Sequence, residues 1–272
     1  MTAPTPIVVL PGANGKVYLS TFSANAEEQK KFSAIKYPGW QSYIAKGLSA
    51  EALIGDIVSQ IVALAPQGPI RIVGISIGGH FGYAAALRLQ ASGREIAGFC
   101  AIDTFMIASS APRVGWARRA LELGVKLVYE RRVGDFGVFI RSNFWRALLR
   151  LAGNRLVNLL RIFGSSGRLP FAFAIDPVLE EELSMRLLLR ESAPWIGSLD
   201  VGPVALLAPA LLLRTSESAN DDPTWRLRCP GIEIIEIAGT HQTIFDPENI
   251  ISLRNLFFNR THLWFSATEG GE

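Results

Sequence analysis

Short apolar runs alternate with amphipathic stretches along the N-terminal part of the chain. The stretch 49–65 begins with a serine and repeats leucine or isoleucine every four positions, which predicts a helix. Residues 80–93 predict a second helix, which ends at a glycine. Strands that alternate with helices in this way indicate a parallel sheet. The predicted strands, all rich in β-branched or aromatic residues, are 6–11, 32–38, 69–76 and 95–103.

The alternation stops between residues 107 and 200. No strand-like run occurs there, and the helical patterns of this segment are 115–132, 143–163 and 176–193. Further along, 210–218 and 232–241 predict two more strands, and 247–260 predicts a closing helix. We therefore expect a single α/β domain over residues 1–272, with residues 107–200 inserted as a helical lid.

Composition narrows the class of protein. With 272 residues and 49% hydrophobic residues, the chain can bury a large core. Its net charge of only +3 argues against nucleic-acid binding by bulk charge. The N-terminus has no basic region typical of a secretory signal, and the longest nearly apolar segment, 203–213, contains two prolines and is too short to span a bilayer. A soluble cytoplasmic protein is expected.

The motif Gly74-Ile75-Ser76-Ile77-Gly78 has the G-x-S-x-G pattern of a nucleophile elbow. In such an elbow a serine lies on a tight turn between a strand and a helix, with its hydroxyl exposed above the sheet. The motif directly follows a predicted strand and precedes a predicted helix, as the elbow requires. The alternative is a serine that only caps the helix. Because a cap does not need glycine on both sides, we interpret Ser76 as a nucleophile.

A nucleophilic serine needs a general base, and the chain has three histidines. His80 lies one helical turn after Ser76 and points along the helix, which favours packing or lining of a pocket. His262 follows the last predicted helix and is expected at the surface. His241 follows a predicted strand in a glycine-containing loop, at the sheet edge where catalytic groups gather in α/β proteins. His241 is therefore the predicted base, the alternative being a surface residue of that loop.

The base in turn needs an acid that orients it and stabilises its charged form. Asp103 ends the predicted strand after the elbow, and Glu217 ends a later one, with Asp221 and Asp222 nearby. Both strand ends lie at the same edge of a parallel sheet, so the pattern alone leaves Asp103 and Glu217 open. Serine, acid and histidine follow in the same order along the chain in either case.

Four segments together resemble the α/β-hydrolase thioesterases of nonribosomal peptide and polyketide synthesis, either integrated or stand-alone. They are VVLPGANG at 8–15, GISIGGH at 74–80, AIDTF at 101–105 and AGTHQTIF at 238–245. The resemblance covers residues 6–106 and about 203–258. It implies an α/β-hydrolase fold, a mostly parallel sheet flanked by helices, and a mobile helical lid that corresponds to the inserted segment.

The resemblance also assigns roles to residues. In the family the catalytic aspartate ends the strand after the elbow, which favours Asp103, 27 residues after Ser76, with Glu217 as the alternative. The oxyanion hole would be formed by the backbone N–H groups of Ile77 and Ala13. Residues 12–16 lack the spacing of a phosphate-binding loop, so nucleotide binding is not expected.

The inserted segment is strongly basic. Between Arg113 and Arg168 it has twelve arginines and lysines but only three acidic residues. Three interpretations remain open: an ordinary solvated helical face, a surface for the acidic carrier domains that deliver acyl chains, and a basic amphipathic helix on a membrane. We favour a functional carrier contact over the membrane, with Arg146 and Arg150 as the residues to test.

The predicted activity is that of a serine thioesterase, which releases an acyl or peptidyl chain from a phosphopantetheine carrier protein by hydrolysis or cyclisation. Alternatives are a carboxylesterase or lipase that acts on free oxygen esters, and a hydrolase-like scaffold without activity. No metal or organic cofactor is expected, since serine and histidine supply nucleophile and base. Cys100 and Cys229 have no metal-binding spacing. A monomer that binds a carrier protein, but no nucleic acid, is expected.

Overall fold

The structure, a computed structural model, divides into two compact units. The residues that it describes are 6–16, 23, 26–105, 129, 133–152, 155–166, 176–199, 204–262 and 264. The α/β unit comprises Met1–Tyr37, Ala50–Ser109 and Ser192–Glu272, and the helical unit comprises Pro38–Ser49 and Ser110–Glu191. The helical unit thus combines most of the inserted segment with the short stretch Pro38–Ser49, which comes from the N-terminal half of the chain.

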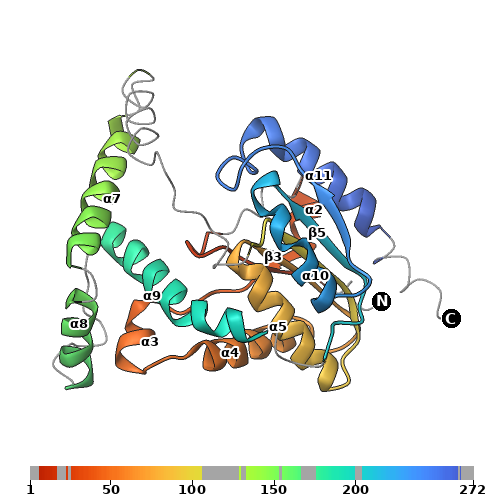
Figure 1. Cartoon of the computed structure of the whole chain (residues 1–272), viewed down its shortest axis with the longest axis horizontal. Coiled ribbons are helices and arrows are strands. Elements are labelled where there is room, and N and C mark those ends of the chain that lie inside the picture. Colours follow the sequence, from red (N-terminus) through yellow and green to blue (C-terminus); the bar gives the residue numbers. More distant parts are fainter. Residues whose placement is uncertain are drawn as a thin grey trace. The chain divides into compact units, whose positions relative to one another are not determined.

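A sheet of six strands forms the centre of the α/β unit (Figure 1). The strand order is β2-β1-β3-β4-β5-β6, and every neighbouring pair is parallel. Each strand falls within a predicted one, so the prediction of a mostly parallel sheet is confirmed. The strands are β1 (Ile7–Leu10), β2 (Phe32–Ala34), β3 (Ile70–Ile75), β4 (Ile96–Ile102), β5 (Ala210–Arg214) and β6 (Glu233–Glu236).

Helices cover both faces of this sheet, and α11 (Pro247–Thr261) and α5 (Ile77–Ala91) lie on opposite sides of the strands in Figure 1. Successive residues of a strand point to opposite faces. On one face, Val73 of β3 lies in a core cluster with Phe257 of α11. On the other, a Cβ at Gly82 of α5 would lie 3.0 Å from the side chain of Ile72. Every residue of β3 is therefore buried.

The order of the strands places the ends of β1 and β3 next to each other. These strands pair directly, although β2 lies between them in the sequence. After β1 the chain crosses to β2 on one side, whereas after β3 it crosses to β4 on the other side. The loops that follow β1 and β3 therefore diverge. Open α/β sheets bind their ligands at such a switch point, beyond the carboxyl ends of the strands. The predicted elbow follows β3 at this position.

Several helices of the α/β unit were not predicted. The short helix α2 (Ala26–Gln29) precedes β2, and η3 (Ser216–Asp221) and α10 (Asp222–Arg228) follow β5. Helix α4 (Ala50–Leu64) was predicted and contacts α5. The short helices contain too few turns to show a clear hydrophobic period, which explains why the pattern missed them.

The helical unit contains α3 (Trp40–Ala45), α7 (Val133–Ala152) and α8 (Arg155–Ser165), and α8 contacts both of the others. Helix α9 (Pro177–Ser198) runs from the helical unit into the α/β unit. The prediction of one helix over 143–163 is wrong, because α7 begins earlier and α8 is a separate element. The predicted helix 115–132 lies outside the described residues, apart from Tyr129.

Within the described ranges, no helix is both long enough and apolar enough to cross a membrane.

Candidate active site

Ser76 lies on the sharp turn between β3 and α5. Its backbone has a φ of 54° and a ψ of −125°, a conformation that non-glycine residues rarely adopt. Although Ser76 occupies the N-cap position of α5, its hydroxyl makes no capping hydrogen bond. Instead, Ser76 Oγ lies 3.2 Å from Nε2 of His241. The hydroxyl is therefore directed at a possible base and not at the helix end.

Glycines on both sides of Ser76 allow this turn. A Cβ at Gly74 would collide with the backbone of Gly78 and Gly79, and a Cβ at Gly78 would collide with the carbonyl groups of Leu10 and Pro11. The elbow is thus packed backbone to backbone against the end of β1. Any side chain at Gly74 or Gly78 would displace the turn that presents Ser76.

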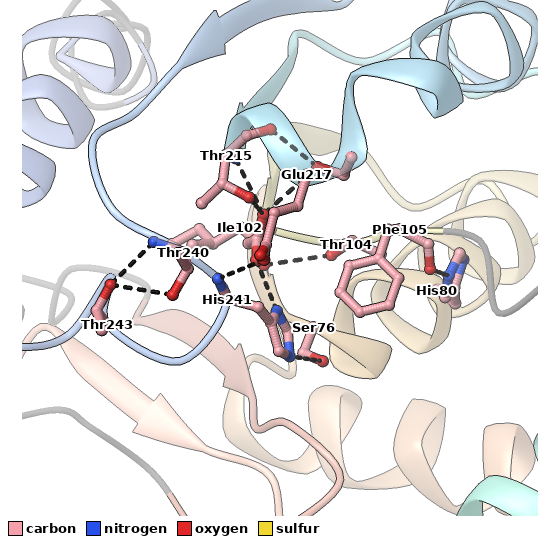
Figure 2. Close-up of polar contacts among 12 residues, drawn as sticks. Ser76, His80, Ile102, Thr104, Phe105, Thr215, Glu217, Thr240, His241 and Thr243 are labelled. Atoms are coloured by element: carbon pink, nitrogen blue, oxygen red, sulfur yellow. Dashed lines mark hydrogen bonds and ion pairs between the residues drawn. The ribbon is translucent and has the colours of Figure 1, made fainter. Parts of the chain in front are cut away.

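His241 lies in the loop after β6, and Figure 2 shows its ring between Ser76 and the end of β4. Hydrogen bonds within the loop fix its backbone: the N–H of Thr240 donates to Thr243 Oγ1 at 2.9 Å, and the side-chain amide of Asn249 donates to the Thr243 carbonyl at 2.9 Å. The side chain of His241 is 22% exposed. The imidazole is therefore fixed in position but accessible.

Asp103, the residue after β4, accepts a hydrogen bond from His241. Its Oδ2 lies 2.6 Å from His241 Nδ1, and its backbone also has a positive φ, 44°. The other carboxylate oxygen, Oδ1, accepts hydrogen bonds from the N–H and the hydroxyl of Thr215, at 3.0 and 2.8 Å, and lies 3.4 Å from the hydroxyl of Ser218. The carboxylate is fully buried, and both of its oxygens have donors.

Burial alone would raise the pKa of Asp103, because it disfavours the charged form. The hydrogen bonds from His241 and from the backbone and hydroxyl of Thr215, together with the charge of His241, outweigh burial and lower the pKa below its ordinary value. Asp103 is consequently ionised at neutral pH and can orient His241 by accepting the proton on Nδ1.

Glu217, the alternative acid, has a different position. Its Oε2 accepts a hydrogen bond from the backbone N–H of His241 at 3.1 Å (Figure 2). The side chain of Glu217 is exposed. Glu217 thus contacts the loop that carries the base but not the imidazole ring. Of the two carboxylates that the sequence left open, the structure pairs Asp103 with the imidazole.

The two predicted oxyanion donors belong to segments next to Ser76. Ile77 is the first residue of α5, so its N–H has no partner within the helix. Ala13 lies in the turn after β1, in which the Gly15 N–H donates to the Gly12 carbonyl at 2.9 Å. A Cβ at Gly12 would lie 3.6 Å from the Cβ of Ser76, which shows how near this turn is to the hydroxyl. Their role as donors remains a prediction.

The other two histidines lie away from the hydroxyl of Ser76. His80 is buried in α5, and its Nε2 lies 3.2 Å from the carbonyl oxygen of Phe105. His262 is exposed at the end of α11, where Nδ1 contacts the Asn259 carbonyl at 2.6 Å. Only His241 is brought next to Ser76.

The predicted carrier residues Arg146 and Arg150 lie in α7, and their side chains are outside the described part of the structure. Other arginines of the basic segment are described. Arg141 pairs with Asp176, and Arg161 pairs with Glu191 at 3.5 Å. Part of the positive charge of the segment is thus balanced within the helical unit.

Thr215, Ser218 and Phe105 also contact the predicted site residues, although no sequence pattern pointed to them. The first two donate to Asp103, and the Phe105 ring packs edge-on with His241, with ring centroids 4.8 Å apart. Thr215 and Ser218 flank Glu217 just after β5, so a search for donors near the second candidate acid could have found them.

Cys100 and Cys229 are both buried and form no disulfide. Burial raises the pKa of each thiol, that of Cys229 to about 12, which keeps them protonated. In the part of the chain that the structure describes, no three His, Cys, Asp or Glu side chains are arranged to hold a metal ion.

A sequence model of the family described as "Thioesterase domain" matches residues 5–130, somewhat less than half of the chain. No curated protein sequence matches the chain.

Solved structures match nearly the whole chain. The NocB thioesterase domain, in covalent complex with a fluorophosphonate nocardicin G analog, is 17% identical with a TM-score of 0.60, and the match covers 95% of each chain. The Vlm2 thioesterase domain bound with a dodecadepsipeptide is 19% identical with a TM-score of 0.55, covering 93% of this chain and 95% of that one.

A third structure is AB3403, a four-domain nonribosomal peptide synthetase bound to AMP and glycine. It is 16% identical, with a TM-score of 0.57, and the match covers 95% of this chain but only 19% of the synthetase. At such low identity these structures establish the fold and not the activity. The α/β-hydrolase fold and the resemblance to thioesterase domains of nonribosomal peptide and polyketide synthesis, both predicted from the sequence, are thus confirmed.

Proposed function

We propose that the protein is a serine thioesterase that releases an acyl or peptidyl chain from the phosphopantetheine arm of a carrier protein. The observation that carries the proposal is the hydrogen-bonded series from Ser76 Oγ to His241 Nε2, at 3.2 Å, and from His241 Nδ1 to Asp103 Oδ2, at 2.6 Å. This series lies in a chain that matches the thioesterase family model and thioesterase domain structures.

In the proposed first step, Ser76 Oγ attacks the thioester carbonyl carbon while His241 Nε2 accepts the hydroxyl proton. Asp103 accepts the hydrogen bond from Nδ1 and stabilises the imidazolium that forms. The N–H groups of Ile77 and Ala13 donate to the oxyanion, each contributing about 3 kcal/mol. The carbon–sulfur bond then breaks, the sulfur takes the proton from His241, and the acyl chain remains as an ester on Ser76.

In the second step, His241 takes a proton from a water molecule or from a nucleophile within the acyl chain. The activated oxygen or nitrogen attacks the ester, and Ser76 Oγ leaves with the proton from His241. Water gives a free acid and an internal nucleophile gives a ring. Neither step needs a metal or organic cofactor besides the phosphopantetheine that the carrier brings.

The structural neighbours support a carrier as the partner. One of them is a domain of a four-domain nonribosomal peptide synthetase. The stretch Arg113–Arg168 of the inserted segment, with twelve basic and three acidic residues, has a charge that would attract an acidic carrier domain. We propose the carrier as the natural source of the thioester on these two grounds.

The test compares wild type with Ser76→Ala on two kinds of substrate. An acyl-loaded carrier protein and p-nitrophenyl esters are each incubated with both proteins, and free acid and nitrophenol are measured. We expect serine-dependent release from the carrier at a higher kcat/KM than ester hydrolysis. Ester hydrolysis without release from the carrier would instead identify a carboxylesterase, and the absence of both activities would favour a non-catalytic scaffold.

A further inference from the structure

The buried ring of His80 has a hydrogen-bond partner at each nitrogen. Nδ1 lies 2.9 Å from Nη1 of Arg228, and Nε2 lies 3.2 Å from the carbonyl oxygen of Phe105. A guanidinium group can only donate, so Nδ1 must accept and the ring proton must be on Nε2, which donates to Phe105. Burial, together with the charge of Arg228, lowers the pKa of His80 to about 3, which is consistent with a neutral ring.

Two further side chains complete this group, which we call the His80 cluster: His80, Trp225 and Arg228. The indole ring of Trp225 stacks on His80, with centroids 5.8 Å apart and an angle of 16° between the planes. The guanidinium of Arg228 lies 5.1 Å from the centroid of the Trp225 ring. His80 and Arg228 are 1% and 3% exposed and Trp225 is fully buried, so packing leaves these side chains little freedom.

The His80 cluster donates to two successive backbone carbonyl groups. Trp225 Nε1–H donates to the carbonyl of Thr104 at 3.0 Å. His80 Nε2–H donates to the carbonyl of Phe105, a contact that Figure 2 shows. These two residues directly follow Asp103, whose φ of 44° is unfavourable for a residue with a side chain. Such a conformation persists only where the surrounding structure holds it. The cluster supplies two of the contacts that do so.

The same segment also contacts the predicted base. The ring of Phe105 packs edge-on with His241, with an interplanar angle of 75°. The segment 103–105 therefore supplies both the carboxylate that accepts from His241 Nδ1 and an aromatic contact on the imidazole. Any shift of its backbone would change both.

We propose that the His80 cluster positions Asp103 and His241 for catalysis through its hydrogen bonds to the Thr104 and Phe105 carbonyls. His80 and Trp225 are then positioning residues. The inference rests on the proposed function, because it assumes that Asp103 and His241 activate Ser76. A displacement of the reacting groups by about 1 Å can lower a rate by about 100-fold.

The variants that test the proposal are Trp225→Phe, His80→Leu and His80→Gln. Trp225→Phe removes the N–H that donates to Thr104 and keeps an aromatic ring. His80→Leu removes both hydrogen bonds of the imidazole, whereas a glutamine amide can still accept from Arg228 and donate to Phe105. Trp40→Phe is the matched control, because the Trp40 indole N–H is buried without a hydrogen-bond partner in the described part of the chain.

The readouts are the rate of Ser76 labelling by a fluorophosphonate and the downfield proton NMR signal of His241 Nδ1–H, with circular dichroism to verify folding. We expect Trp225→Phe and His80→Leu to slow labelling by about 10- to 100-fold and to shift the signal. His80→Gln is expected to recover most of the rate, and Trp40→Phe to match wild type. If His80→Leu does not fold, the rate of Ser76 labelling in Trp225→Phe tests the proposal by itself.

Labelling of folded Trp225→Phe and His80→Leu at the wild-type rate would overturn the inference while leaving the proposed function intact. Equal losses in His80→Gln and His80→Leu would also overturn it, since they would reflect repacking and not the hydrogen bonds. If wild type itself is not labelled at Ser76, the proposed function fails and the inference fails with it.

Discussion

Oδ2 of Asp103 lies 2.6 Å from Nδ1 of His241, although 138 positions separate the two residues in the sequence. The contact forms because β4 and β5 are neighbours and β6 follows β5, so the residues after β4 and β6 meet at one edge of the sheet. The relation between these two side chains determines which nitrogen of the imidazole faces Ser76.

The first prediction concerns the acid. Asp103→Asn would replace the acceptor of the Nδ1 proton by a group that can also donate, and the wrong tautomer of His241 would then face Ser76. We expect kcat to fall by about 10³- to 10⁴-fold. Glu217→Gln keeps an oxygen that can accept the His241 backbone N–H. We therefore expect kcat to fall by less than about fivefold, which corresponds to about 1 kcal/mol, the net contribution of one hydrogen bond.

Both variants are measured on the same p-nitrophenyl ester, with thermal unfolding as a control for folding. A much larger loss in Glu217→Gln than in Asp103→Asn would contradict the assignment of Asp103.

The second prediction concerns the oxyanion loop. The hydroxyl of Tyr37 donates to the carbonyl oxygen of Pro11 at 2.8 Å, two residues before Ala13. Tyr37→Phe removes this hydrogen bond, while the ring can still pack edge-on against Phe81. Because the loop would then hold the Ala13 N–H less firmly, we expect kcat to fall about tenfold with little change in KM. An unchanged kcat in the folded variant would show that Tyr37 does not position the loop.

The third prediction is a dependence of stability on pH. His80 has a folded-state pKa of about 3 and an unfolded-state pKa of about 6.5, so between these values the unfolded chain binds more protons. The free energy of unfolding therefore falls as the pH is lowered from 7 to 5, with a limiting slope of about 1.4 kcal/mol per pH unit from this group. In His80→Gln the titrating imidazole is absent, so its free energy of unfolding should fall less over the same pH range.

Urea unfolding of wild type and His80→Gln at pH 7, 6 and 5 measures the difference. The pKa of Asp103 is lowered from its already acidic ordinary value, so this carboxylate loses its stabilising charge only below this range. Equal pH dependence in the two proteins would mean that His80 is not held neutral.

The fourth prediction tests the basic segment. Replacement of both Arg146 and Arg150 by glutamate should raise KM for an acyl-loaded carrier about tenfold at low salt, and less at high salt, with ester hydrolysis unchanged. The control reverses two exposed lysines of the α/β unit, Lys31 and Lys36, to glutamate. If the control raises KM as much as the arginine variant, net charge and not this segment attracts the carrier.

The sequence predicted the sheet because each strand is a separate apolar run. It also predicted Ser76 and His241 as site residues, since glycines around Ser76 and a strand end before His241 are local signals, and the structure places these two side chains 3.2 Å apart. The choice between Asp103 and Glu217 was not local, because both follow strands that end at the same edge of the sheet. What distinguishes them is the turn of Asp103 into a positive φ and its contacts with Thr215.

The contacts of His80 could not be predicted from the sequence either. Its partner Arg228 is 148 positions away, in a short helix that the hydrophobic pattern did not reveal. A histidine one turn into an apolar helix is compatible with simple packing, and only the fold shows which carbonyl its second nitrogen faces.

The acyl-enzyme on Ser76 is the most direct test of the proposed mechanism. An acyl-loaded carrier is mixed with wild type or Ser76→Ala, the reaction is quenched within its first turnover, and the protein is analysed by intact and peptide mass spectrometry. We predict that wild type gains the mass of the acyl group on the peptide that contains Ser76, and that Ser76→Ala gains none. Release of the acyl chain at the same rate by both proteins, without an adduct on Ser76, would contradict the proposed mechanism.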